Sequence, residues 1–263
     1  PIILQPSEVM KVSLIAGLSR FYSDCGDIRI HWLRSILIPF FMVTMPLLLV
    51  INQPDLGTAI LIFFSSIALI FVAGISYWLL LSGLFICFIS MPFIWSTLHT
   101  YQKERVLTFL NPERDPLGSG YHIIQSKIAI GSGGLFGKGW TNGSQAQLEF
   151  LPERHTDFIF AVLGEEFGLL GVIGLLSLYM FVIGRGLYIS IQAHDSFSRL
   201  LSGSISLTFL VYVFVNTAMV TGLVPVVGVP LPLVSLGGTS MVTLMIGFGI
   251  LMSIQSNRKL LPH

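Results

Sequence analysis

Residues 157–186 decide the fold class, because they read DFIFAVLGEEFGLLGVIGLLSLYMFVIGRG, with four charged side chains in thirty positions. A helix needs about 20 mostly apolar residues to cross a bilayer, so this stretch predicts a membrane-spanning helix. Similar stretches, the first of them shorter and more polar, lie at about 6–22, 35–52, 55–74, 77–98, 198–222 and 236–255. We therefore predict an all-α polytopic transmembrane helical bundle of about seven spans.

The composition of the whole chain excludes several other classes. Of the 263 residues, 53% are hydrophobic and 10% are charged, whereas soluble domains carry roughly 25% charged residues. A mean hydropathy of +0.83 excludes a water-soluble domain, and a net charge of +1 excludes a basic nucleic-acid-binding protein. Cys25 and Cys87 lie too far apart for a CxxC site and show no zinc-ligand spacing. We expect one membrane domain over residues 1–263, and the start at Pro1 suggests a fragment of a longer protein.

The distribution of basic residues predicts the orientation of the chain in the membrane. In and beside the short loops of one side lie Arg20, Arg29, Arg34, Arg185, Arg199, Arg258 and Lys259. Short connections on the other side, at 52–54 and 223–235, carry no Lys or Arg. Because cytoplasmic loops are enriched in basic residues, the first side should be cytoplasmic. Counting spans from there places the long segment 99–156 outside the cytoplasm.

Segment 99–156 is too apolar for a disordered loop. Its stretch IIQSKIAI, residues 123–130, predicts a helix or an amphipathic element on the membrane surface. The stretch GSGGLFGKG, residues 131–139, forces bends but is not a P-loop, because Gly139 follows Lys138 where Ser or Thr is required. The segment also carries several basic residues. They could form a patch facing lipid headgroups, or they could bind a diphosphate: Lys103, Arg105, Arg114, Lys127, Lys138 and Arg154.

Ionisable residues inside predicted spans are functional candidates, because burying a charge in a membrane is costly. Glu8 and Lys11 share one helix face, either as a structural pair or as part of a site. Asp55 opens a helix, where a carboxylate also complements the helix dipole. Of Glu165 and Glu166, we expect one to face a polar interior and to bond Asn216 or Thr217.

Two further features accompany these charged residues. The connection 223–235 reads LVPVVGVPLPLVS, which is too rich in proline for a helix and too apolar for a solvated loop. It must pack on protein, either as a buried connector or as one wall of a lipid-binding cavity. Gly164, Gly168 and Gly171 are interpreted as positions of close helix packing.

Asp157 stands where the long segment meets the span that follows. Thr156 is a plausible N-cap, which would place Asp157 in the first helical turn. The helix dipole would then lower the pKa of Asp157 and make it a permanent anion. Partial burial at the water–lipid boundary would instead raise that pKa towards the range of a general base. The residues alone leave both interpretations open.

Five long strings resemble the SEDS family of shape, elongation, division and sporulation proteins, and its RodA branch more than its FtsW branch. They are QPSEVMK, QPDLGTAI, ERVLTFLNPERDPLGSGYHIIQSKIAIGSGGLFGKGW, LPERHTDFIFAVLGEEFG and VGVPLPLVSLGGTS. The resemblance implies ten spans, of which this chain would lack the first three. It also implies a protein of the bacterial cytoplasmic (inner) membrane that polymerises lipid II on the extracytoplasmic face for cell elongation and rod shape.

The resemblance further implies roles for residues and partners. The catalytic carboxylate falls on Asp157, and a buried charged cluster falls on Glu8, Lys11 and Asp55, to which we add Glu165. The candidate substrate-binding residues are Arg105, Lys127, Lys138, Arg154 and His155. The implied partners are a class B penicillin-binding protein and other membrane proteins of the elongation complex. No metal ligand is assigned, although a divalent cation could help to neutralise a departing diphosphate.

Three rival functions follow from the same features. An FtsW-like septal glycosyltransferase shares many of the strings. A lipid II flippase would also need a charged cavity and an apolar wall, but it would not need a carboxylate beside a basic loop at the outer surface. A non-enzymatic scaffold for cell-wall synthesis is compatible with the fold alone.

Overall fold

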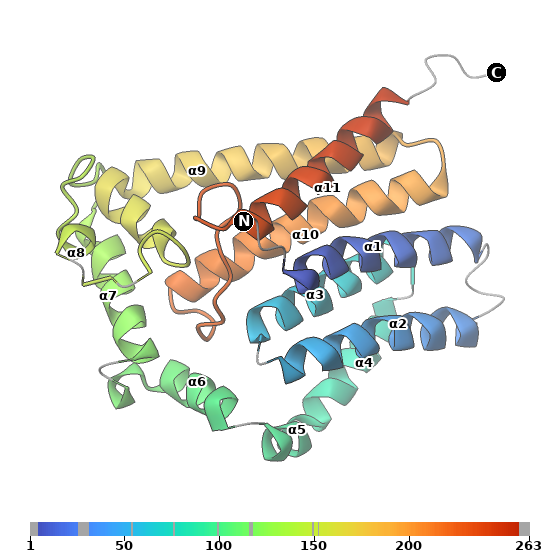
Figure 1. Cartoon of the computed structure of the whole chain (residues 1–263), viewed down its shortest axis with the longest axis horizontal. Coiled ribbons are helices and arrows are strands. Elements are labelled where there is room, and N and C mark those ends of the chain that lie inside the picture. The colour runs from blue at the N-terminus through green and yellow to red at the C-terminus, as the bar shows by residue number, and fades with distance from the viewer. Residues whose placement is uncertain are drawn as a thin grey trace. The chain divides into compact units, whose positions relative to one another are not determined.

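The computed structural model describes residues 5–25, 32–53, 55–75, 77–98, 100–115, 118–148, 150–151 and 153–257. These residues form helices joined by turns, with no strand among them, as the sequence predicted (Figure 1). The helices are α1 (Pro6–Asp24), α2 (Trp32–Asn52), α3 (Leu56–Val72), α4 (Tyr77–Ile89), α5 (Met91–Thr97), α6 (Thr100–Leu110), the 3-10 helix η1 (Pro112–Arg114), α7 (Ser119–Ser132), α8 (Ser144–Gln147), α9 (Ile159–Gln192), α10 (Ser196–Val220) and α11 (Gly238–Ser256).

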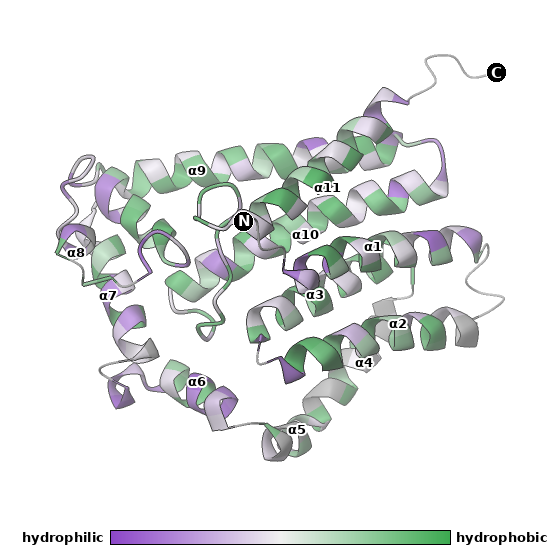
Figure 2. Cartoon of the chain, in the orientation of Figure 1, coloured by the Kyte–Doolittle hydropathy of each residue, from purple (hydrophilic) through white to green (hydrophobic). Residues whose placement is uncertain are grey.

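Within the described residues, four helices have the length and apolarity needed to cross a membrane. They comprise residues 35–52 of α2 together with α9, α10 and α11. The helix α3 is also apolar but has 17 residues. Hydrophobic residues colour much of these helices (Figure 2). Large apolar side chains such as Phe41, Met45 and Phe181 are exposed, as expected of surfaces that face lipid. The chain is therefore an integral membrane protein.

Two parts of the sequence prediction differ from the structure. The stretch 77–98, predicted as one span, forms two helices, α4 and α5, on either side of Ser90. Segment 99–156, predicted as a loop with one helical element, contains α6, η1, α7 and α8. The helix α7 includes residues 123–130, as predicted. The count of seven spans and the extracytoplasmic position of 99–156 stay predictions, and Arg29, Arg258 and Lys259 lie outside the described residues.

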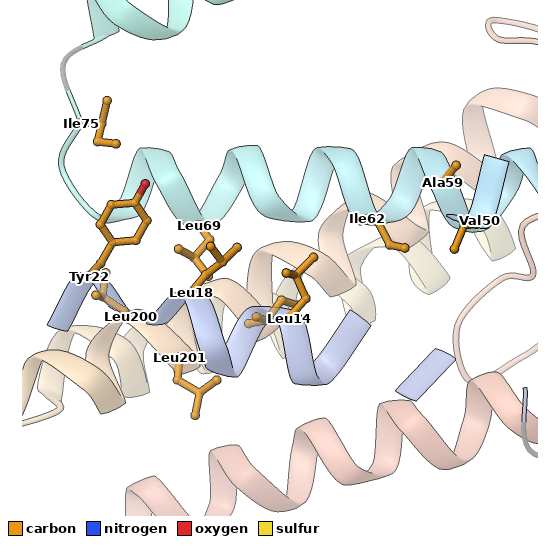
Figure 3. Packing of buried hydrophobic residues seen from close by; sticks show 11 residues of the cluster. Leu14, Leu18, Tyr22, Val50, Ala59, Ile62, Leu69, Ile75, Leu200 and Leu201 are labelled. Atoms are coloured by element: carbon orange, nitrogen blue, oxygen red, sulfur yellow. The ribbon is translucent and has the colours of Figure 1, made fainter. Parts of the chain in front are cut away.

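Two compact units make up the chain. Unit 1 comprises Pro1–Leu80, Met180–Val211 and Gly237–His263, and unit 2 comprises Leu81–Tyr179 and Tyr212–Leu236. The core of unit 1 forms where one face of α1 packs on α3 and α10 (Figure 3). Leu14, Leu18 and Tyr22 recur every four residues, so they share that face of α1. Their partners include Ala59, Ile62, Leu69, Leu200 and Leu201.

In unit 2, α7 packs on the end of α10 and the connection after α10 folds back over protein. The Ser126 hydroxyl donates to the Val220 carbonyl at 2.8 Å, and Ile123 beside it is buried. The connection 223–235 is irregular, as predicted, and it packs on protein because Val229 and Leu231 are each 1% exposed. The Tyr179 hydroxyl donates to the Pro232 carbonyl at 2.6 Å.

Candidate functional site

Asp157 lies in a turn that precedes α9, which places it differently from the sequence prediction. Residues 153–158 form turns, and α9 begins at Ile159. The Thr156 hydroxyl donates to the Glu153 carboxylate at 2.7 Å, so Thr156 is not the predicted N-cap. The turn is closed by the Phe158 amide, which donates to the Glu153 carbonyl at 3.3 Å. Asp157 therefore stands two residues before the helix, where the dipole acts less strongly on it.

Three successive carbonyl groups of this turn accept hydrogen bonds from other segments of the chain. The Leu236 amide donates to the His155 carbonyl at 2.9 Å. The Ser235 hydroxyl donates to the Thr156 carbonyl. The Asn216 side-chain amide donates to the Asp157 carbonyl at 2.9 Å. The backbone that carries the candidate carboxylate is thus bonded to two other segments of unit 2.

The side chain of Asp157 has the electrostatic character that a proton acceptor needs. It is half-buried, and burial raises its pKa above the ordinary value. The nearby Glu153 carboxylate raises the pKa further, whereas the positive charge of Arg105 lowers it. Of the two interpretations left open by the sequence, the structure supports the raised pKa. Among the described residues, no group donates a hydrogen bond to this carboxylate.

Gly228 allows the connection to approach Asp157 closely. Gly228 has a φ of +74°, which residues with a side chain rarely adopt. A Cβ atom at this position would lie 3.5 Å from Oδ2 of Asp157. The backbone of the connection therefore forms one wall beside the carboxylate, whereas a lipid-binding cavity lined by the connection stays a prediction.

The predicted basic residues occupy different places within unit 2. The Arg105 Nη1 donates to the Val226 carbonyl at 3.2 Å, two residues before Gly228. The Arg154 Nε donates to Nε2 of His155 at 3.1 Å, in the turn that also carries Asp157. Lys127 is exposed on α7, and its side chain lies against Gly222 at the end of α10. The structure thus brings Arg105 into electrostatic range of Asp157, and Arg154 and His155 share its turn.

Lys138 has a structural partner. Its Nζ lies 2.7 Å from Oε1 of Glu165, a carboxylate with a side-chain exposure of 0%. Glu165 also accepts from the Ser144 hydroxyl at 3.1 Å and from the Gln145 amide at 3.1 Å. The prediction that Glu165 or Glu166 bonds Asn216 or Thr217 is wrong for Glu165, whose bonds go to the segment that follows α7. Lys138 is therefore assigned a structural role and is not proposed as a substrate contact.

The glycine-rich stretch 131–139 forms hydrogen bonds with the backbone of α9 where that helix is interrupted. Gly168 has φ +65° and ψ −163°, which interrupts the helix. A Cβ atom there would lie 2.3 Å from the Gly137 amide nitrogen, so Gly168 packs closely on the glycine-rich stretch and not, as predicted, on another helix. The amides of Lys138 and Gly139 donate to the carbonyls of Glu165 and Glu166, both at 3.0 Å. The Leu169 amide donates to the Gly134 carbonyl at 2.9 Å. The stretch therefore satisfies backbone groups that the break would leave unpaired.

The two other glycines of this group differ in their surroundings. A Cβ atom at Gly133 would lie 2.0 Å from the Gly164 carbonyl, so Gly164 is a point of close approach between α7 and α9. At Gly171 the nearest atom to an added Cβ is the Phe167 Cβ of the same helix, at 2.2 Å. The packing interpretation therefore applies to Gly164.

The remaining predicted cluster lies in unit 1. The Lys11 Nζ donates to Oε1 of the buried Glu8 at 2.6 Å, and the Thr243 hydroxyl of α11 donates to Oε2 at 3.1 Å. Asp55 caps α3, because it accepts from the Thr58 amide at 3.0 Å. Its charge also acts on Lys11. The structure thus groups Glu8, Lys11 and Asp55, whereas Glu165 belongs to unit 2. No group of three His, Cys, Asp or Glu side chains able to hold a metal ion occurs in the part of the chain that the structure describes.

Residues 1–260 match the family of cell cycle proteins that groups FtsW, RodA and SpoVE. The chain belongs to this family. Its relatives include "Peptidoglycan glycosyltransferase MrdB" of Escherichia coli K12, which is 52% identical over 98% of this chain and 69% of that protein. They also include "Probable peptidoglycan glycosyltransferase FtsW" of Trichlorobacter lovleyi, which is 41% identical over 98% of this chain and 68% of that protein. The family resemblance seen in the sequence is confirmed.

Two solved structures of the family resemble the chain along nearly all of its length. One, from work on the structural coordination of polymerization and crosslinking by a peptidoglycan synthase complex, has a TM-score of 0.82 and 35% identity. It covers 99% of this chain and 72% of its own chain. The other, the rod shape determining protein RodA of Thermus thermophilus, has a TM-score of 0.67 and 28% identity over 98% of this chain and 67% of its own.

Sequence reasoning missed several residues of this family member's site. Asn216 was considered only as a partner for a glutamate, although an amide side chain inside the apolar stretch 198–222 is itself a signal. Glu153 gave no signal, because its effect on Asp157 depends on the turn. His122 packs its ring 5.7 Å from that of Phe158, and burial lowers its pKa despite the charges of Glu153 and Asp115. Burial therefore disfavours the charged form of His122.

Proposed function

We propose that this protein is a peptidoglycan glycosyltransferase that polymerises lipid II into glycan strands for cell elongation, with Asp157 as the general base. One observation carries the assignment of the base: the Asp157 carboxylate is half-buried, has a raised pKa and accepts no hydrogen bond from the described residues. The 52% identity to a peptidoglycan glycosyltransferase supports the reaction class. The lower identity to FtsW supports elongation over septal synthesis.

The proposed reaction is the transfer of a glycosyl group from a polyprenyl-diphosphate-linked donor to a sugar hydroxyl. The hydroxyl oxygen attacks the anomeric carbon of the donor, and the bond from that carbon to the diphosphate breaks. The diphosphate leaves with the bonding electrons, and Asp157 takes the proton of the hydroxyl. A positioned base typically contributes 10²–10⁴-fold to such a rate, and its pKa should lie near the working pH.

Positive charge near Asp157 would stabilise the departing diphosphate. Arg105 is the first candidate, since its charge acts on Asp157 from beside the connection. Arg154 adjoins the same turn, and Lys127 is exposed on α7. Fixed cationic groups stabilise charge that develops in a transition state without reorganisation at the moment of reaction.

The proposed location is the bacterial inner membrane, with Asp157 on the extracytoplasmic face. The absence of Lys and Arg from the sequence of the connection 223–235 supports this orientation. Single cysteines at the exposed positions Gln147 and Ser196, in a chain whose Cys25 and Cys87 are replaced by serine, test it. An impermeant thiol reagent added to intact spheroplasts should label position 147 and spare position 196. Equal labelling of both positions would contradict the topology.

The proposed partner is a class B penicillin-binding protein, since new glycan strands need crosslinking. The similarity to a chain from a peptidoglycan synthase complex supports a partner of this kind. Co-purification of the full-length protein from mild detergent should recover the transpeptidase. Failure to recover it when both proteins are expressed would contradict the pairing.

Polymerisation of fluorescent lipid II by the purified full-length protein, with and without that transpeptidase, tests the function directly. We expect long glycan strands in the presence of the partner. Transport of lipid II across vesicle membranes without any polymer would contradict the proposal and would support a flippase. Restoration of rod shape to cells depleted of their own elongation enzyme would distinguish elongation from septal synthesis.

A further inference from the structure

Asn216 is a buried polar residue whose donors are both used close to Asp157. It lies in α10 with 0% exposure. Its side-chain nitrogen donates to the Asp157 carbonyl at 2.9 Å and to the Val229 carbonyl at 2.7 Å. A side-chain amide has two N–H donors, so both are occupied. Both acceptors are backbone groups, and neither lies in α10.

The two carbonyls that Asn216 holds flank the candidate carboxylate. One belongs to Asp157 itself. The other belongs to Val229, which follows Gly228, where an added Cβ would lie 3.5 Å from Oδ2 of Asp157. The bonds from Ser235 and Leu236 to the turn hold only Thr156 and His155, the two preceding residues. Asn216 alone among these three donors bonds both the residue that bears the carboxylate and the wall beside it.

Asn216 differs from an apolar side chain of similar size in its oxygen and in its two donors. Its Oδ1 is buried and has no hydrogen-bond partner among the described residues. An apolar side chain would avoid the cost of that unpaired acceptor, but it would leave the carbonyls of Asp157 and Val229 without this donor. The two donors are therefore the favourable feature that distinguishes asparagine from leucine at this position.

We propose that Asn216 is a positioning residue, which fixes the Asp157 carboxylate relative to the wall formed by Gly228 and Val229. The proposal rests on the proposed function of Asp157 as the base. It predicts that loss of the two donors lowers the turnover rate and leaves substrate binding nearly unchanged, because small displacements of a reacting group cost rate.

Asn216→Leu, Asn216→Asp and Asn216→Ser in the full-length protein test the proposal. The control is Thr217→Ala, since among the described residues the Thr217 hydroxyl bonds only carbonyls of its own helix, those of Val213 and Phe214. The assay measures lipid II polymerisation per amount of folded protein, as kcat and KM, across a range of pH. We expect Asn216→Leu to lower kcat by about 10- to 100-fold with KM changed less than about threefold, and the control to be normal.

The other two variants separate positioning from a structural role. Asn216→Asp should also move the acid limb of the kcat profile to higher pH, because a second carboxylate disfavours ionisation of Asp157. Asn216→Ser, with one donor, keeps the fold testable if the leucine variant does not fold, and should show an intermediate loss of kcat. A merely structural residue would lower the yield of folded protein without changing kcat or the pH profile of what remains.

The outcomes also separate this inference from the proposed function. Normal kcat in the Asn216 variants beside an inactive Asp157→Asn protein overturns the inference alone. An active Asp157→Asn protein overturns the function assigned to Asp157 and the inference with it.

Discussion

Asp157 differs from the other candidate carboxylates, in unit 1 and in its own unit 2, in how fully it is bonded. In unit 1, Glu8 accepts from Lys11 and Thr243, and Asp55 accepts from the amide and hydroxyl of Thr58. In unit 2, Glu165 accepts from Lys138, Ser144 and Gln145. Asp157, in that same unit, accepts from no described residue and has a raised pKa. Hydrogen bonds to a carboxylate stabilise its anion, so a fully bonded carboxylate makes a poor proton acceptor.

This difference separates structural carboxylates from a chemical one. Burial and charge pairing alone do not distinguish the two kinds of carboxylate, because Glu165 is more deeply buried than Asp157 and has an ion-pair partner. The unused bonding capacity of Asp157, in a turn that is fixed through its backbone, is what distinguishes it.

The largest effect on stability is expected at Glu165. Glu165→Leu leaves the donors of Ser144 and Gln145 unpaired and removes the partner of Lys138. Lys138 is 31% exposed and can still reach water, so we expect a loss of about 2–3 kcal/mol in the free energy of unfolding. Chemical denaturation in detergent measures it, with Ser132→Ala as the control, since Ser132 makes the longest bond to Glu165 at 3.5 Å. Unchanged stability would show that Glu165 is not a structural anchor.

Removal of the positive charge of Arg105, which lowers the pKa of Asp157, should change the rate of polymerisation. Arg105→Gln takes away a positive charge that lowers this pKa, so the pKa rises and the acid limb of the rate profile moves to higher pH. We also expect the rate at neutral pH to fall by about tenfold or more through weaker stabilisation of the leaving group.

The matched control for Arg105 is Lys103→Gln. Lys103 is on the same helix α6 but donates to the Ser96 carbonyl at 3.4 Å. Its pH profile should coincide with that of the unsubstituted protein. Equal shifts in the two variants would mean that general surface charge, and not Arg105, acts on Asp157.

A smaller effect is expected at Asp55, the cap of α3. Asp55→Ala should lower the free energy of unfolding by about 1 kcal/mol, and Asp55→Asn should lose much less, because asparagine is also a good cap. Polymerisation per folded protein should stay within about twofold in the asparagine variant, a change below 0.5 kcal/mol in the barrier. A large loss of rate at normal stability in that variant would give Asp55 a chemical role.

The sequence was sufficient for those features that depend on local pattern. Apolar runs predicted the helical class, and three prolines in 223–235 predicted an irregular segment packed on protein. The residues of α7 were apolar enough to predict a helix. These signals are local, because each depends on side chains within one stretch.

Features that depend on distant backbone partners were not predictable. The break of α9 at Gly168 persists because residues 134–139 bond its freed groups, and Gly168 alone resembles a packing glycine. Lys138 meets Glu165 because the same stretch packs against α9, a contact that the sequence does not indicate. Asn216 donates to the backbone carbonyls of residues 157 and 229, and the sequence does not indicate which carbonyls a side chain will bond. The resemblance thus pointed to Asp157, whose role stays a proposal, and the sequence did not indicate the residues that hold its turn.

The most direct test of the account is the rate of lipid II polymerisation by the full-length Asp157→Asn protein with its transpeptidase partner. The substitution keeps the shape of the side chain and removes the proton acceptor. We predict a rate lower by 10²-fold or more. Because the pKa of Asp157 is raised, its ionised form opposes folding at pH values above that pKa, so the unfolding temperature of the variant at neutral pH should be equal or slightly higher. A polymerisation rate equal to that of the unsubstituted protein would contradict the assignment of Asp157 as the base.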